Sequence, residues 1–219
     1  MRERPERVIN LAGLQLPLLD TVIIAVTTVV LLTDHYADGV RGTDAALAQS
    51  IDRAFLFGVV PLAVLLLLRE RPFDYGLRMG SWRVGIALTI GLALVATPLI
   101  LVVSRLPEFA EYYNRDVTDP ARLLVTHALD VGPAEFLSRG FLMFTLVRRA
   151  GPIGVVLATF PFVFTHLGKP ALETYSTLLG GTLFGWMAWR TGSVLYAFLL
   201  HLYILTLIVV AASAVTGSG

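Results

Sequence analysis

The sequence contains no cysteine among its 219 residues. This absence excludes disulfide bonds, thiolate metal ligands and a cysteine nucleophile. Lysine occurs once, at Lys169, so almost all of the basic charge is arginine. The formal net charge is only +1, which gives no general attraction to nucleic acid or to a strongly acidic partner. We therefore expect no nucleic-acid partner, and the preference for arginine over lysine is typical of a prokaryotic source.

Charged residues are also scarce, at 15% of the chain, whereas 56% of the residues are hydrophobic. The mean hydropathy of +0.74 is too high for an ordinary soluble domain. The length allows a single domain over residues 1–219. The composition therefore predicts an all-α, polytopic membrane helical bundle in contact with the lipid bilayer.

The apolar runs predict about seven transmembrane helices. They cover residues 16–32, 54–68, 84–103, 118–149, 153–166, 172–189 and 194–215. The first run has no small-residue cleavage site after it, so we expect it to be a retained span. The polar stretch 104–119 is expected to be a surface loop, and the aromatic and basic residues of 73–83 are expected to lie at the lipid headgroups.

Arginine is more frequent in the segments that face the cytoplasm if the N-terminus lies inside. The sequence therefore predicts a multi-pass protein of a prokaryotic cytoplasmic membrane with its N-terminus inside and its C-terminus outside. No internal repeat is visible, which argues against the inverted-repeat architecture of many transporters.

The centre of the chain is the segment 132–140, which places Glu135 and Arg139 four residues apart within a predicted span. Residues at i and i+4 share one face of a helix. Each charge alone costs roughly 2.5 to 3.5 kcal/mol in hydrocarbon, so such a pair usually lines a protein interior or a wet cavity. Pro133 removes a backbone donor, which predicts a bend just before Glu135.

Other polar residues fall in or near the predicted spans. The full set is Asp20, His127, Asp130, Glu135, Arg139, His166, Glu173 and His201. One acid with two imidazoles can activate water and polarise a carbonyl group. The same residue types can also bind a metal, in which case the ligands would be Glu135, His166 and His201. The spacing leaves both possibilities open, and Asp20 is expected to make a hydrogen bond between helices.

The motifs Glu135-x-x-x-Arg139 and Phe162-x-x-x-His166, followed by His201 in the last span, resemble the CAAX protease and bacteriocin-processing (CPBP, or Abi) family. The resemblance covers about residues 70–205. It implies an intramembrane, glutamate-dependent endopeptidase that acts on membrane-protein or lipidated peptide substrates and needs no cofactor, although a divalent metal remains open. On this reading Glu135 and His166 activate water, His201 stabilises the oxyanion, and Arg139 orients Glu135.

The sequence departs from the family pattern at two positions. The family's first motif commonly carries two adjacent glutamates, and Ala134 stands where the first is expected. Leu205 stands where the third motif often has asparagine. The His-Leu-Gly-Lys-Pro run that begins at His166 is similar to a branch of the family with a single-glutamate first motif.

Three further residues are secondary catalytic candidates: Asp130, His127 and Glu173. Two other functions remain open. The departures at Ala134 and Leu205 favour a catalytically inactive member that binds a membrane peptide, as an immunity or chaperone-type protein does. A small transporter or channel gated by Glu135 and Arg139 is the third possibility.

Overall fold

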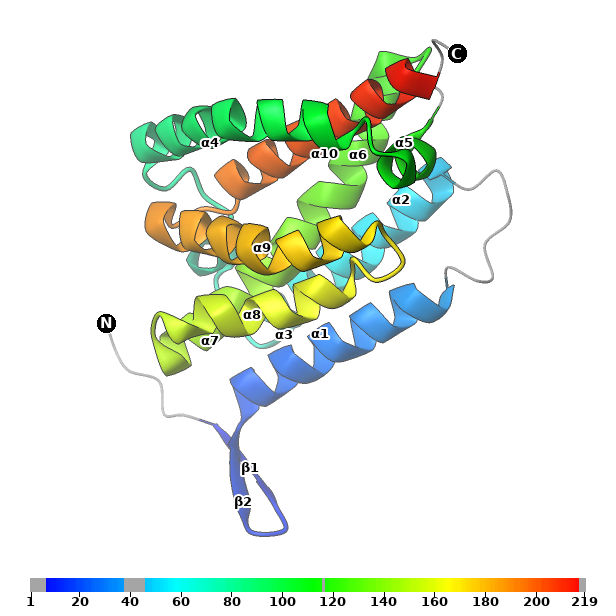
Figure 1. Ribbon diagram of the computed structural model, residues 1–219. Coiled ribbons are helices and arrows are strands. Elements are labelled where there is room, and N and C mark those ends of the chain that lie inside the picture. Colours follow the sequence, from blue (N-terminus) through cyan, green and yellow to red (C-terminus); the bar gives the residue numbers. More distant parts are fainter. Residues whose placement is uncertain (1–6, 38–45, 116, 217–219) are drawn as a thin grey trace.

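The computed structural model of the chain describes residues 7–37, 46–115 and 117–216. The predicted all-α class is confirmed, because these residues form helices apart from one short hairpin (Figure 1). The elements are β1 (Val8–Leu11), β2 (Leu14–Pro17), α1 (Leu18–Ala37), α2 (Ala46–Ala54), η1 (Phe55–Val59), α3 (Val60–Leu67), η2 (Pro72–Tyr75), α4 (Trp82–Val103), α5 (Pro107–Tyr113), α6 (Pro120–Glu135), η3 (Phe136–Met143), α7 (Phe144–Ala150), α8 (Ile153–Phe164), α9 (Ala171–Thr191) and α10 (Leu195–Thr216).

Continuous helical segments join several of these elements into longer rods. The π-helix η1 connects α2 to α3, and the π-helix η3 connects α6 to α7. Apart from the short α5, the rods of the described residues are α1, α2–η1–α3, α4, α6–η3–α7, α8, α9 and α10. Each of the seven predicted runs thus corresponds to one rod, and successive rods cross the bundle in alternating directions (Figure 1).

Four of these rods are long and apolar enough to cross a membrane. They cover Leu18–Tyr36, Leu47–Leu67, Trp82–Val103 and Leu195–Val215. The second is longer than the predicted run 54–68, because the amphipathic helix α2 extends it toward the N-terminus. Of the other three rods, α8 is a shorter apolar helix, α6–η3–α7 carries Glu135 and Arg139, and α9 carries Glu173.

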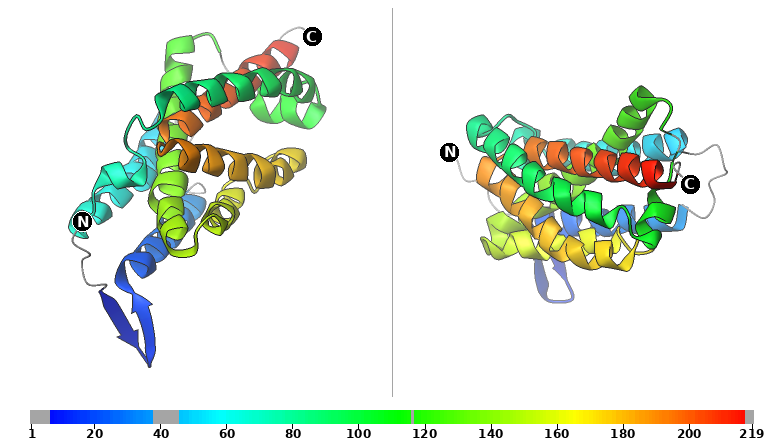
Figure 2. Two further views of the ribbon diagram at one scale, coloured as in Figure 1. Left: turned by 90° about the vertical axis from the view of Figure 1, so that its left-hand side faces the viewer. Right: turned by 45° about the horizontal axis from the view of Figure 1, so that its top comes forward.

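The α6–η3–α7 rod runs through the middle of the bundle (Figures 1 and 2). All eight residues of η3 are buried, and this segment contacts α1, α8 and α9, while α6 contacts α2 and α10. A π-helical stretch is rare and often marks a functional position. Here it begins directly after Glu135, so the irregular backbone lies beside the predicted site.

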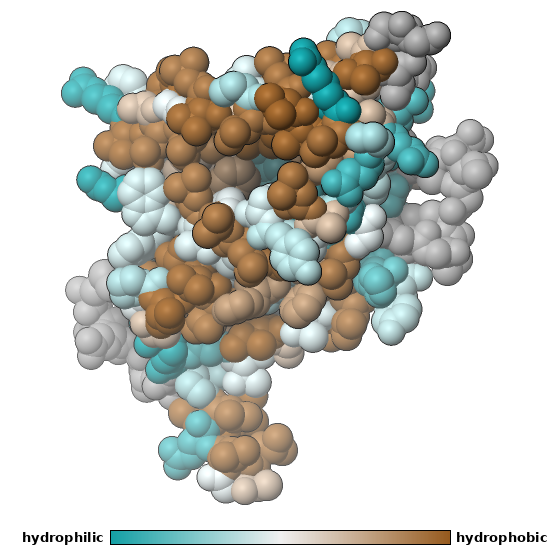
Figure 3. Space-filling view, viewed as in Figure 1, coloured by the Kyte–Doolittle hydropathy of each residue, from teal (hydrophilic) through white to brown (hydrophobic). Residues whose placement is uncertain are grey.

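The outward surface of α4 is apolar, as a lipid-facing helix requires. Figure 3 shows hydrophobic side chains spread over this face of the molecule. The exposed large hydrophobic residues of α4 include Ile86, Ile90, Leu94, Val95, Leu99, Leu101 and Val102. An exposed apolar surface of this extent fits contact with a bilayer better than contact with water.

The prediction of a surface loop over residues 104–119 is wrong in its central part. Pro107–Tyr113 forms α5, which packs on α10. The side chains of Phe109 and Tyr113 are buried in a second core with Ile208 and Val209. Phe109 and Tyr113 are spaced by one helical turn, so they share a face in spite of the acidic residue Glu111 between them.

The interfacial placement of residues 73–83 is only partly right. Phe73 and Trp82 are exposed, but Tyr75 is fully buried and belongs to the main core. The Arg148 guanidinium lies 4.2 Å from the centre of its ring, and burial raises the pKa of Tyr75 to about 12. Tyr75 therefore belongs to the protein interior, whereas most of the segment stays on the surface.

The N-terminal hairpin was not predicted. Strands β1 and β2 pair in antiparallel register, with Val8 opposite Pro17, and the turn residues Ala12 and Gly13 both have positive φ. Two positive φ values are the signature of a tight hairpin turn. Alanine is uncommon in such a turn, so the residues at positions 12 and 13 do not predict the hairpin.

Candidate active site

Glu135 is the last residue of α6 and is fully buried. The helix that carries it starts at Pro120, with the Asp119 side chain accepting a hydrogen bond from the backbone N–H of Arg122. Such a cap fixes the start of a helix, and Pro is favoured at its first position. The backbone continues through Pro133, and the π-helical segment begins one residue after Glu135.

Arg139 pairs with Glu135 as predicted. Its Nε atom lies 3.3 Å from Oε2 of Glu135, and both side chains are buried. The guanidinium also covers the ring of Phe162 at 3.7 Å and donates a hydrogen bond to the carbonyl oxygen of Gly181 at 3.4 Å. Arg139 therefore links η3 to α8 and α9 as well as supplying the counter-charge to Glu135.

His201 comes from α10 and meets the other carboxylate oxygen. Its Nδ1 atom lies 2.7 Å from Oε1 of Glu135. Because a carboxylate only accepts hydrogen bonds, the Nδ1–H group is the donor, and Nε2 is left for a reactant. The structure thus pairs Glu135 with His201, whereas the resemblance implies that Glu135 activates water together with His166.

His166 lies in the turn after α8 and is buried. Its Nδ1 atom is 3.1 Å from the carbonyl oxygen of Phe162 and 3.1 Å from the Thr165 hydroxyl. Since a carbonyl accepts, Nδ1 again carries the proton. The rings of His166 and His201 lie 4.7 and 6.0 Å from the ring of Phe162, so this aromatic side chain brings the two histidines to one place.

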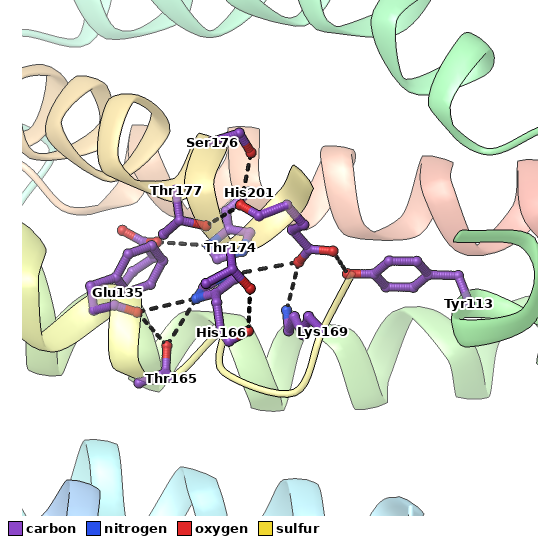
Figure 4. A network of polar contacts seen from close by, with 11 residues as sticks. Tyr113, Glu135, Thr165, His166, Lys169, Thr174, Ser176, Thr177 and His201 are labelled. Atoms are coloured by element: carbon purple, nitrogen blue, oxygen red, sulfur yellow. Dashed lines mark hydrogen bonds and ion pairs between the residues drawn. The ribbon is translucent and has the colours of Figure 1, made fainter. Parts of the chain in front are cut away.

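The Nε2 atom of His166 faces a second acid. Oε1 of Glu173, in the first turn of α9, lies 4.0 Å from it. Lys169 donates a hydrogen bond to the same oxygen at 2.9 Å. The Tyr113 hydroxyl donates to Oε2 of Glu173 at 2.5 Å. Figure 4 shows His166 and Lys169 between Glu135 and Tyr113.

The hydroxyl of Tyr113 is a stable donor in this arrangement. Burial, and then the carboxylate of Glu173, raise the pKa of Tyr113 well above its ordinary value. The phenol therefore keeps its proton at neutral and mildly alkaline pH. Sequence reasoning missed this residue because it lies in α5, where the polar composition of 104–119 predicts a loop.

Two secondary candidates lie elsewhere on α6. The Nδ1 atom of His127 is 3.1 Å from the Thr206 hydroxyl of α10. Asp130 lies beside Ser50 and Arg53 of α2, and its Oδ1 atom is buried without a hydrogen bond. The described contacts join neither residue to Glu135.

Both departures from the family pattern lie in apolar surroundings. Ala134 is packed against the main core, and Leu205 is packed against the second core beside Ile208. No acid is therefore available at position 134 and no amide at position 205. The acids that lie next to the histidines are Glu135 and Glu173.

A metal site would need the acidic and histidine side chains to converge on one point. Within residues 7–37, 46–115 and 117–216, no group of three or more histidine, aspartate or glutamate side chains is arranged to hold a metal ion. The three ligands proposed from the sequence do not converge, because Glu135 meets Nδ1 of His201 and His166 faces Glu173. We derive no step through a metal.

Helices α8 and α9 pack closely beside the site. A Cβ added at Gly181 would meet Phe162 and Thr159 at 3.0 Å, and one at Gly185 would meet Val155 at 2.9 Å. Sequence reasoning did not identify Phe184, whose ring lies 5.4 Å from that of His201.

The fold and the site define a polytopic helical membrane protein with a buried acid–arginine pair and two histidines on separate elements. Residues 118–207 match the family model described as type II CAAX prenyl endopeptidase Rce1-like. The match agrees with the resemblance drawn from the three motifs and confirms it over this part of the chain. The match starts later than the expected 70–205 core and includes Glu135, His166 and His201. No curated protein and no solved structure matches the chain.

Proposed function

We propose that the chain is an intramembrane endopeptidase that hydrolyses a peptide bond in the tail of a prenylated, otherwise lipidated or membrane-anchored protein. The observation that carries this proposal is the buried contact of Glu135 with both Arg139 and Nδ1 of His201. An acid that fixes one nitrogen of an imidazole leaves the other nitrogen oriented for proton transfer. The family match supplies the substrate class, since it is described as a prenyl endopeptidase.

The two histidines divide the chemistry between them. Nε2 of His166 takes a proton from water, and the oxygen of that water forms a bond to the carbonyl carbon of the peptide. His201, in its protonated form, donates from Nε2 to the carbonyl oxygen as it becomes an oxyanion. The C–N bond then breaks, and the proton on His166 passes to the leaving amine.

Glu135 supports His201 and does not itself reach the solvent-accessible side. The His201 side chain is 16% exposed, and that of Glu135 is 0% exposed. Glu135 therefore balances the charge of the imidazolium, while Arg139 balances Glu135. This assigns Glu135 a positioning role and revises the expectation that it activates water directly.

The test compares membrane proteomes of cells that express the wild-type chain or Glu135→Gln at equal levels. We expect some anchored proteins to keep an extra tail only with the variant. Asp20→Asn is the control, because Asp20 lies outside the site and accepts a hydrogen bond from Arg149 at 2.7 Å. Identical proteomes from wild-type and Glu135→Gln cells would contradict the proposal.

One second function is favoured by a specific observation. Ala134 and Leu205 remove two polar groups of the family pattern and pack in apolar cores. A member that binds a peptide tail without cutting it needs neither group. Retention of a tail-bearing partner by wild-type chain and Glu135→Gln alike, with no shortened product, would support this function.

The last part of the proposal concerns the dependence of cleavage on a divalent metal. We propose that cleavage needs no divalent metal, because the donor set does not converge. Treatment of the purified chain with EDTA is expected to leave its rate unchanged. Loss of cleavage on chelation, with recovery on adding Zn²⁺, would contradict this part.

A further inference from the structure

The segment after His166 brings a second acid to the site. Pro170 ends the turn, α9 begins at Ala171, and Glu173 lies in the first turn of that helix. The backbone of this region is tied to the histidine, because the Thr174 hydroxyl donates to the carbonyl oxygen of His166 at 2.7 Å. The position of Glu173 relative to His166 is therefore fixed by the local fold.

Contacts from two other residues fix the carboxylate itself. The Lys169 ammonium donates to Oε1, and the Tyr113 hydroxyl donates to Oε2. Tyr113 comes from α5, sixty residues earlier in the chain. A surface ion pair between Lys169 and Glu173 would contribute little by itself, but a buried tyrosine from another element adds geometric definition.

The separation of the two reactive atoms fits one shared water. Oε1 of Glu173 and Nε2 of His166 are 4.0 Å apart, which is too long for a direct hydrogen bond. One water that donates its two hydrogens to two acceptors holds them roughly 4 to 4.5 Å apart at ordinary hydrogen-bond lengths. The carboxylate and the imidazole can therefore bind the same water molecule from two sides.

We infer that Glu173 is a catalytic residue whose carboxylate, together with His166, binds the attacking water. The residue at position 134 cannot supply this carboxylate because it is alanine. The water donates one hydrogen to Nε2 of His166 and the other to Oε1 of Glu173. The first proton moves to His166 as the water oxygen attacks the peptide carbon. Glu173 keeps the water oriented and offsets the positive charge that develops on His166.

This inference rests on the proposed function and has its own test. The purified full-length chain is assayed with a synthetic peptide copied from a tail that accumulates in Glu135→Gln cells. We expect Glu173→Gln to lower kcat by at least about 100-fold, the lower range for a general acid or base, with KM within about threefold of wild type. Glu111→Gln, an exposed carboxylate of α5, is the matched control and is expected to retain the wild-type rate.

Tyr113→Phe tests the same arrangement without changing any charge. It removes one donor to Glu173 and keeps the ring in the second core. We expect a fall of about tenfold in kcat, which corresponds to one hydrogen bond of about 1.4 kcal/mol. Thermal unfolding in detergent checks that each variant remains folded.

The outcomes separate the inference from the proposed function. Full kcat in Glu173→Gln together with loss of cleavage in Glu135→Gln would overturn the inference and leave the endopeptidase in place. A merely structural role of Glu173 predicts a raised KM and lowered thermal stability, with kcat retained, and this result would also overturn it. No tail accumulating in Glu135→Gln cells would overturn both.

Discussion

His201 and Glu135 lie 66 positions apart in the chain, and Nδ1 of the histidine is 2.7 Å from a carboxylate oxygen of the glutamate. The contact joins α10 to the point where α6 becomes the π-helix η3. It leaves Nε2 of the imidazole as the atom that faces a reactant. The chemical role of His201 therefore depends on a residue that is itself fully buried.

The first prediction concerns this histidine. His201→Gln removes the imidazole and is expected to lower cleavage of the tail peptide by at least about 100-fold. His127→Gln is the matched control, since His127 also contacts α10 but bonds Thr206. We expect it to stay within about threefold of wild type. An equal loss of cleavage in the two variants would contradict the assignment of His201 to the active site.

A second prediction concerns the ion pair. Arg139→Met leaves Glu135 buried without its guanidinium partner, and breaking such a pair costs about 3 to 5 kcal/mol. His201 still contacts Glu135, so we expect the free energy of unfolding to fall by about 3 kcal/mol, the lower end of this range. The free energy of unfolding in mixed detergent micelles is the measurement.

The double variant Arg139→Met with Glu135→Gln is the control for that prediction. It removes both charges, so its stability is expected to recover by at least about 1 kcal/mol relative to Arg139→Met alone. Purely additive losses would mean that the guanidinium acts through Phe162 and Gly181 and not through Glu135.

The sequence predicted the parts of the fold that depend on long apolar runs. The rods and the position of Glu135 and Arg139 follow from hydropathy and helical spacing, which are local properties. The partner of each histidine was not predictable in the same way. Whether Glu135 meets His166 or His201 depends on how α8, α9 and α10 pack around η3, and one sequence does not contain that information.

The position of Tyr113 also depends on tertiary packing that its local sequence does not reveal. A short helix with acidic residues on one face and aromatic residues on the other has the composition of a loop. Its burial depends on α10, which provides Ile208 and Val209 on the opposite side of the contact. The aromatic spacing from Phe109 to Tyr113 was the available signal.

The third prediction tests the orientation in the membrane. The chain has no cysteine, so single-cysteine variants can be labelled without interference. Arg71→Cys lies between α3 and α4, and Asn114→Cys lies between α5 and α6; both residues are exposed. With the N-terminus inside, a membrane-impermeant maleimide added to intact cells should label Asn114→Cys and not Arg71→Cys. The opposite pattern would reverse the proposed orientation.

The fourth prediction uses two adjacent glycines with different surroundings. A Cβ at Gly181 would lie 3.0 Å from both Phe162 and Thr159, whereas a Cβ at Gly180 meets nothing within 4 Å. Gly181→Ala must therefore displace Phe162, the ring that both histidines contact, and overpacking of this kind costs about 1 to 3 kcal/mol. We expect this variant to lose stability and most of its cleavage, while Gly180→Ala keeps both. Thermal unfolding and the peptide assay measure the two effects, and an equal response of the two variants would mean that α8 and α9 are not packed as described.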